Sequence, residues 1–205
     1  MHRPSGFKPA KFARNSRRRS VGRWAVIAVA ALAIFGAHVG TRAQTPPSPS
    51  PGVATFEKIA DVLNHRRCVN CHQRESPLMG DTGRAHVPRV ARAPERGRAR
   101  TPACTSCHRA ANDVASGVPG APNWRLPPVA LAWAGKSKAQ LCRDLKNPAT
   151  NGNRSLQALV SFMTHDPLAL WAWSPGLNRT AVLIPHSEFV GLLNLWVESG
   201  APCPG

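Results

Sequence analysis

Acidic residues are scarce in this chain. Ten Asp and Glu stand against 27 Lys and Arg among 205 residues, and the first 43 residues contain no acid. Those 43 residues hold nine of the basic residues, so the remainder carries 18 basic and ten acidic side chains, a formal charge of +8. Because a third of the basic residues belongs to the N-terminal segment, the overall charge of +17 does not indicate a nucleic-acid partner.

Long hydrophobic runs are also scarce, and the clearest one extends from Trp24 to Gly40. It follows a basic stretch and precedes the small residues around Ala43, which is the pattern of a cleaved signal peptide at residues 1–43. A run of this length is at the lower limit for a membrane span, so an uncleaved anchor in the inner membrane is the alternative. The Pro- and Ser-rich residues 44–54 predict a flexible linker.

Two copies of one pentapeptide occupy residues 68–72 and 104–108. Each has the pattern C-x-x-C-H, the attachment signature of c-type haem. The two thiols bond to the haem vinyl groups, and the following histidine supplies the proximal nitrogen to iron. The sequence therefore predicts two haem c groups, attached through Cys68, Cys71, Cys104 and Cys107, with His72 and His108 as the proximal ligands.

The C-x-x-C pattern has two other common uses, in zinc sites and in redox pairs. Zinc sites of the paired type place roughly 15–20 residues between the pairs, whereas 32 residues separate Cys71 from Cys104 here. Zinc also gives no reason for a histidine directly after both pairs. A thioredoxin-like redox pair would need a βαβ context, which neither neighbourhood indicates.

The chain has two further cysteines, Cys142 and Cys203. Export and covalent haem both favour an oxidising compartment, most simply the bacterial periplasm, where a disulfide between these two is expected. Two unpaired buried thiols are the alternative.

The rest of the chain predicts a mainly α fold with long loops and little or no sheet, a single dihaem domain over residues 55–205. Residues 55–66 have apolar side chains at helical spacing, whereas residues 72–103 show no sustained period. Three more helices are expected after the cap residues Ser137, Ser155 and Ser187, ending near Lys146, His165 and Gly200. The two macrocycles and the tryptophans are expected to supply much of the core.

Several runs in the C-terminal half carry a family resemblance. They are residues 120–124 (GAPNW), Leu141-Cys142, residues 146–152 (KNPATNG), residues 165–167 (HDP) and residues 171–173 (WAW). With them the chain resembles the small cytochrome c proteins known as isoquinoline 1-oxidoreductase subunits, over about residues 54–204. The resemblance implies an electron-accepting companion of a molybdenum hydroxylase of the xanthine oxidase group. Substrate oxidation would then belong to that partner.

Each iron needs a sixth ligand if it is only to transfer electrons. His86 is the first candidate, because it lies in the loop between the motifs with no other evident role, and the resemblance also suggests a histidine there. His165 is the second, although it could instead cap its helix. Met163 is the main rival and Met79 a further one; His65 and His186 complete the set.

These observations predict a periplasmic dihaem cytochrome that passes electrons from a molybdenum hydroxylase-type dehydrogenase to the respiratory chain and is not itself an enzyme. A dihaem peroxidase-like enzyme is the alternative, but no carboxylate is clearly placed for its acid–base chemistry. A structural role with incidental haems is a third possibility. The arginines of residues 84–100, with Arg109, are expected to pair with haem propionates or to dock an acidic partner, a solvated basic loop being the other interpretation.

Overall fold

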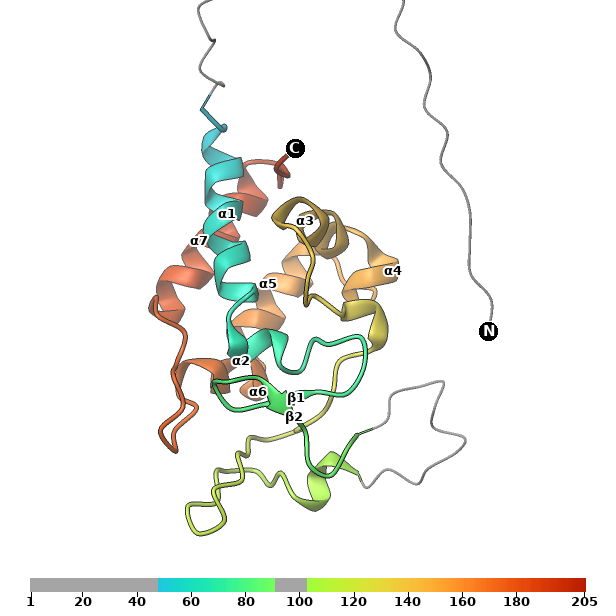
Figure 1. Cartoon of the computed structure of the whole chain (residues 1–205). Coiled ribbons are helices and arrows are strands. Elements are labelled where there is room, and N and C mark those ends of the chain that lie inside the picture. Colours follow the sequence, from blue (N-terminus) through green and yellow to red (C-terminus); the bar gives the residue numbers. More distant parts are fainter. Residues whose placement is uncertain (1–47, 91–102) are drawn as a thin grey trace, which may run out of the picture. The chain divides into compact units, whose positions relative to one another are not determined.

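The computed structural model describes residues 48–90 and 103–205, shown in Figure 1. These residues are mainly helical, with one two-stranded sheet, as the sequence predicts. The predicted signal peptide and Arg92, Arg96, Arg98 and Arg100 lie outside the described residues. The helices are α1 (Pro51–Leu63), α2 (Arg66–Val69), α3 (Lys138–Lys146), α4 (Pro148–Asn151), α5 (Leu156–His165), α6 (Pro167–Leu170) and α7 (His186–Glu198). Across the described ranges, no helix combines the length and apolarity that a bilayer span requires.

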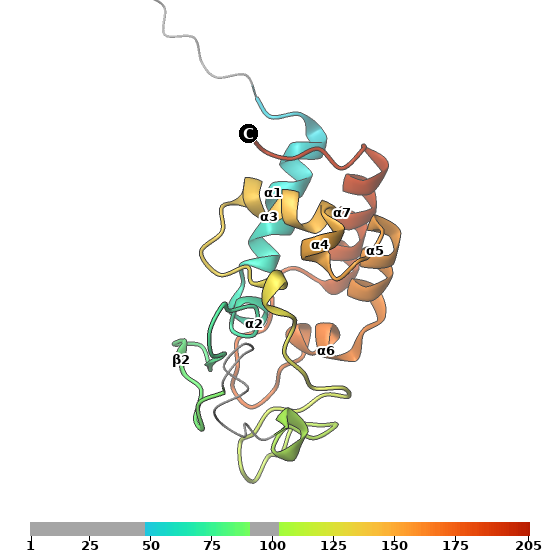
Figure 2. The same ribbon diagram turned by 90° about the vertical axis from the view of Figure 1, so that its right-hand side faces the viewer.

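Helices α1 and α7 lie side by side and form the centre of the core (Figures 1 and 2). The apolar side chains at helical spacing in residues 55–66 are Phe56, Ile59, Ala60 and Leu63. All four are buried, because spacings of three and four residues place them on one face of α1. The Phe56 ring packs against Trp196 of α7, with 5.0 Å between the ring centroids. The predicted amphipathic helix is therefore confirmed, but it begins at Pro51. Residues 51–54, predicted as the end of a flexible linker, are therefore helical, because Ser50 caps the helix and Pro51 suits its first turn.

Helix α5 adds a third layer to this core. It buries Leu159 and Met163, and Ser155 caps its N-terminus by accepting a hydrogen bond from the Ala158 backbone. Helix α3, earlier in the chain, begins with a capping box, in which Ser137 and Gln140 each bond the other's backbone N–H. Both predicted caps are confirmed.

The start of α7 differs from the prediction. The helix begins at His186 with Pro185 as its N-cap residue, so Ser187 lies inside the first turn. Proline has a fixed φ and no N–H, which suits it to a helix start, and here its position outweighs the capping preference of serine. The C-terminal end agrees with the prediction, because Gly200 follows the last turn with a positive φ of 84°.

The inter-motif segment contains one small sheet. Strands β1 (Leu78–Met79) and β2 (Arg84–Ala85) pair antiparallel, with Leu78 opposite Ala85. The hairpin lies beside α2 in Figure 1. Its two strands are too short to show a period in the sequence.

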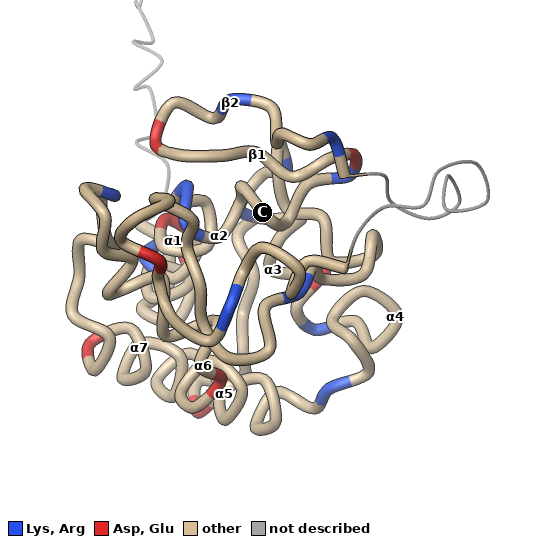
Figure 3. The backbone as a smooth tube through the Cα atoms, turned by 90° about the horizontal axis from the view of Figure 1, so that it is seen from below, with Lys and Arg blue, Asp and Glu red and all other residues tan. Residues whose placement is uncertain are grey.

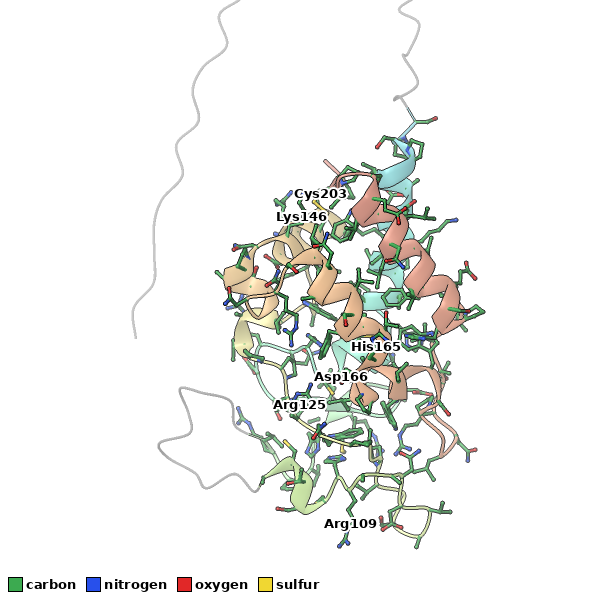
Figure 4. All side chains as sticks on the ribbon, turned by 180° about the vertical axis from the view of Figure 1, so that it is seen from behind. Arg109, Arg125, Lys146, His165, Asp166 and Cys203 are labelled. Atoms are coloured by element: carbon green, nitrogen blue, oxygen red, sulfur yellow. A yellow bond between two sulfur atoms is a disulfide. The ribbon has the colours of Figure 1, made fainter. Side chains whose placement is uncertain are left out.

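The predicted disulfide between Cys142 and Cys203 is present and ties α3 to the C-terminal residues. Lys146 of α3 also donates a hydrogen bond to the Ala201 carbonyl at 2.8 Å, near Cys203 in Figure 4. Because the bridge closes a loop of 61 residues, its removal restores much conformational freedom to the unfolded chain.

Replacing Cys142 and Cys203 together with serine is expected to lower the free energy of unfolding by about 4 kcal/mol. Urea titration of the oxidised wild type and the double variant measures the difference. The reduced wild type is the matched control, and its urea midpoint should equal that of the double variant. Equal stability of oxidised and reduced protein would contradict the prediction.

Candidate functional site

The two C-x-x-C-H pentapeptides adopt the same local backbone. Cys68 lies in α2, and the His72 N–H donates to the Cys68 carbonyl at 3.1 Å. Cys104 begins a 3-10 turn (Cys104–Ser106), and the His108 N–H donates to the Cys104 carbonyl at 2.9 Å. A single helical turn brings positions one, four and five of each motif to one side of the chain. Both thiols and the histidine can therefore approach one planar group.

The His72 ring is oriented by the segment before α3. Its Nδ1 lies 2.6 Å from the Leu131 carbonyl oxygen, and its ring stacks on Trp133 with 3.5 Å between centroids and 11° between planes. The Trp133 backbone N–H also donates to the His72 carbonyl. Because a carbonyl only accepts, Nδ1 must carry the proton, and Nε2 of the neutral ring is then the nitrogen with the lone pair.

The second histidine is held in the same way by a different loop. His108 Nδ1 lies 2.7 Å from the Pro119 carbonyl oxygen, and its ring stacks on Trp124 at 4.5 Å and 3°. Burial lowers the pKa of His108 and outweighs the hydrogen bond to Pro119, which alone would raise it; the charges of His86 and Arg179 add to the lowering. The neutral imidazole, which is the form that binds a metal, is therefore favoured.

Two cavities open beside the two motifs. The first has a volume of about 500 Å³ and is lined by Cys68, Cys71 and His72 with apolar residues of α1, α5 and α6. The second has a volume of about 370 Å³ and is lined by Cys104, Cys107 and His108 with the β1–β2 hairpin. Both volumes lie in the range of cofactor sites. Five residues line both cavities and form their common wall: Arg67, Cys71, Trp124, Leu126 and Trp171.

His86 and His108 both line the second cavity. The centroids of the two rings are 5.9 Å apart, and the ring planes are tilted by 51°. A bond from imidazole nitrogen to a metal is about 2 Å, so two rings that share one ion have centroids about 6 Å apart. His86 Nδ1 bonds the Pro88 carbonyl at 2.8 Å, which assigns its lone pair to Nε2. Met79 of β1 lines the same cavity and is the rival there.

The first cavity contains a different candidate. Met163 of α5 lines it and is 7 % exposed, whereas His165 is exposed, bonds the Ser161 carbonyl through Nδ1 and lines neither cavity. Side chains two positions apart on a helix point about 200° apart, so Met163 and His165 lie on opposite faces of α5. His65 caps α2, and His186 bonds the Met163 carbonyl. Neither of these histidines lines the first cavity.

Burial strongly affects the first motif thiol. It raises the pKa of Cys68 to about 12, and the neighbouring Cys71 adds to the effect. A thiol in this state is protonated and unreactive at neutral pH. Attachment of haem at Cys68 would therefore be easier before this thiol is buried.

Several polar atoms are buried without a hydrogen-bond partner in the described part of the chain. Three of them are N–H donors that belong to residues lining the cavities: Trp133 Nε1 in the first, Arg179 NH1 in the second, and Arg67 Nε in the wall between them. Buried donors are normally satisfied, so these three fit a bound group that brings acceptors. Haem, with its two propionate carboxylates, is such a group.

Comparison with known proteins adds no identification. A scan against family models, a search of curated proteins and a search of solved structures each returned no match. The functional conclusion therefore depends on the residues and their geometry. Among the described residues, no three His, Cys, Asp or Glu side chains gather as a bare metal ion would need.

The structure also identifies site residues that the sequence did not indicate. Trp124 and Trp133 were predicted only as core, but they stack on the two motif histidines. The carbonyls of Leu131 and Pro119 carry no sequence signal, because every residue has one. Arg109 was a candidate partner for a propionate, but it is exposed and lines neither cavity, and it points away from the helices in Figure 4.

Proposed function

We propose that this chain is a periplasmic dihaem c-type cytochrome that carries electrons for a partner dehydrogenase. The observation that supports this most directly is that His72 and His108 have the same kind of surroundings. Each histidine follows a C-x-x-C pair, lines its own cavity and donates Nδ1–H to a backbone carbonyl. Metal-bound histidines have this second hydrogen bond because it fixes the tautomer and orients the ring.

The residues around each cavity have separable roles in this function. Bound haem iron supplies reversible one-electron chemistry. His72 and His108 would bind and orient the two irons, with Trp133 and Trp124 supporting the imidazole planes. Bound haem would displace water from these mainly apolar cavities, which would strengthen the effect of each nearby charge. A common wall keeps the two cavities close enough to serve one electron path.

For the sixth positions we propose His86 at the second cavity and Met163 at the first. His86 is at a ring separation suited to a shared metal, and Met163 is the one candidate from the sequence that lines the first cavity. This gives the two sites unlike ligands. Methionine raises a haem potential relative to a second histidine, so electrons would pass from the second site to the first.

The partner follows from the family resemblance, which implies a molybdenum hydroxylase-type dehydrogenase as donor. Docking of an acidic partner would use the arginines of residues 84–100, of which Arg84 and Arg89 are described and exposed. In Figure 3, Lys and Arg occur on several sides of the described backbone and do not gather on one face. Electrostatic steering of a partner toward this loop would therefore depend on the arginines of the loop itself and not on a charged face of the whole protein.

The test is the haem content and reactivity of the exported protein. Two covalent haems should remain after denaturation, and both reduced irons should resist carbon monoxide because their sixth positions are filled. Reduction by the hydroxylase with its substrate, followed by stopped flow, should slow as salt rises. Absence of covalent haem would contradict the proposal. Rapid carbon monoxide binding with peroxide turnover would instead favour the peroxidase-like alternative.

A further inference from the structure

Arg67 is a buried cation in the wall between the two cavities. Its side chain is 2 % exposed, and its NH2 bonds the Gly80 carbonyl at 3.1 Å and forms an ion pair with Asp81. Its guanidinium lies 5.8 Å from the centroid of the Trp171 ring. Nε has no partner. Burial of a cation is costly unless its donors are satisfied, so this arrangement is incomplete without a further acceptor.

Arg179 is a second cation in the same region, because its neighbour Thr180 bonds Asp81, the ion-pair partner of Arg67. Arg179 donates from NH2 to the Gly117 carbonyl at 2.7 Å, whereas its NH1 is buried without a partner. Burial lowers the pKa of Arg179, and the charge of Arg67 acts in the same direction. Asp81 partly offsets them, but it is also occupied by the Thr180 backbone N–H and hydroxyl.

The lining of the second cavity has an excess of positive charge. It contains Arg66, Arg67, Arg84 and Arg179, and no Asp or Glu. A cavity with four arginines, two of which have a buried unsatisfied N–H, fits a ligand that carries carboxylates, because guanidinium and carboxylate make paired hydrogen bonds.

We propose that Arg67 and Arg179 receive a propionate carboxylate of the second haem, and that the charge of Arg67 raises the reduction potentials of both haems. This inference rests on the proposed function. Arg67 reaches both sites because it lines both cavities, whereas Arg179 lines only the second. A fixed positive charge at the wall favours the reduced state, which has one positive charge fewer, at either iron.

The test is an EPR-monitored redox titration, which follows the two ferric haems separately. In R67Q, the ratio of reduced to oxidised haem at a fixed potential should fall about tenfold at both haems, a shift of about 59 mV for a one-electron couple. R179Q should lower the ratio at the second haem only. R67K keeps the charge and should stay close to wild type. D81N removes the opposing charge and should shift both potentials upward by a smaller amount.

Arg154→Gln is the matched control, because Arg154 lines only the first cavity and should leave the second potential unchanged. A shift at one haem alone in R67Q, or equal shifts in R67Q and R67K, would overturn the inference. If R67Q does not fold, the D81N titration tests the inference in its place. An unchanged or lowered potential at either haem in D81N would contradict an effect of the Arg67 charge on both haems. Covalent haem is counted first: its absence contradicts the proposed function, whereas its presence with the wrong shifts contradicts only the role of Arg67 and Arg179.

Discussion

Replacing Cys104 and Cys107 together with alanine is expected to leave a folded protein with one covalent haem in place of two. These cysteines belong to a 3-10 turn and a loop, and the buried core is formed by other segments. Loss of the two thioether bonds should therefore remove the second haem without collapse of α1, α5 and α7. Mass spectrometry of the denatured protein measures the loss as one haem mass.

The matched variant replaces Cys68 and Cys71 with alanine. It should also lose one haem, but its stability should fall further because Cys68 packs against the core, whereas Cys107 is exposed. Comparison of thermal unfolding of the two single-haem proteins tests this asymmetry. Retention of both haems by either variant would show that its motif does not attach the cofactor.

The spin state of the second haem is expected to change from low to high when His86 is replaced with alanine. The centroids of the His86 and His108 rings are 5.9 Å apart, and His86 bonds the Pro88 carbonyl through Nδ1. Removal of His86 would take a proposed ligand from the second haem alone. EPR of the ferric protein should show one high-spin and one low-spin haem. An unchanged spectrum would exclude His86 and favour Met79, which lines the same cavity.

Two further variants are controls for this ligand assignment. Met163→Leu preserves apolar volume and should abolish the sulfur-to-iron charge-transfer band of the first haem, leaving the second unaffected. His165→Ala should change neither spectrum, since His165 is exposed and lines neither cavity. A high-spin first haem in His165→Ala would contradict the preference for Met163.

Much of the fold was predictable from sequence because the relevant signals are local. The buried face of α1, the serine caps of α3 and α5, and the glycine after α7 each depend on side chains within one or two helical turns. The Cys142–Cys203 bridge was predictable for another reason, since only two cysteines fall outside the motifs. The start of α7 was mispredicted because proline and serine compete at one helix end.

Sequence alone determined the local chemistry of each motif, because two thiols and a histidine within five residues are brought together by a single turn of backbone. Only the tertiary structure decided what surrounds each motif. Arg67 precedes the first motif by one residue, yet its place in the wall of the second cavity depends on contacts with Gly80 and Asp81. The tertiary structure likewise places His86 and Met163 in the cavity linings and leaves His165 exposed. A one-dimensional pattern names the side chains, but burial and distance between segments far apart in the chain select which of them meet, and those depend on how the whole core packs.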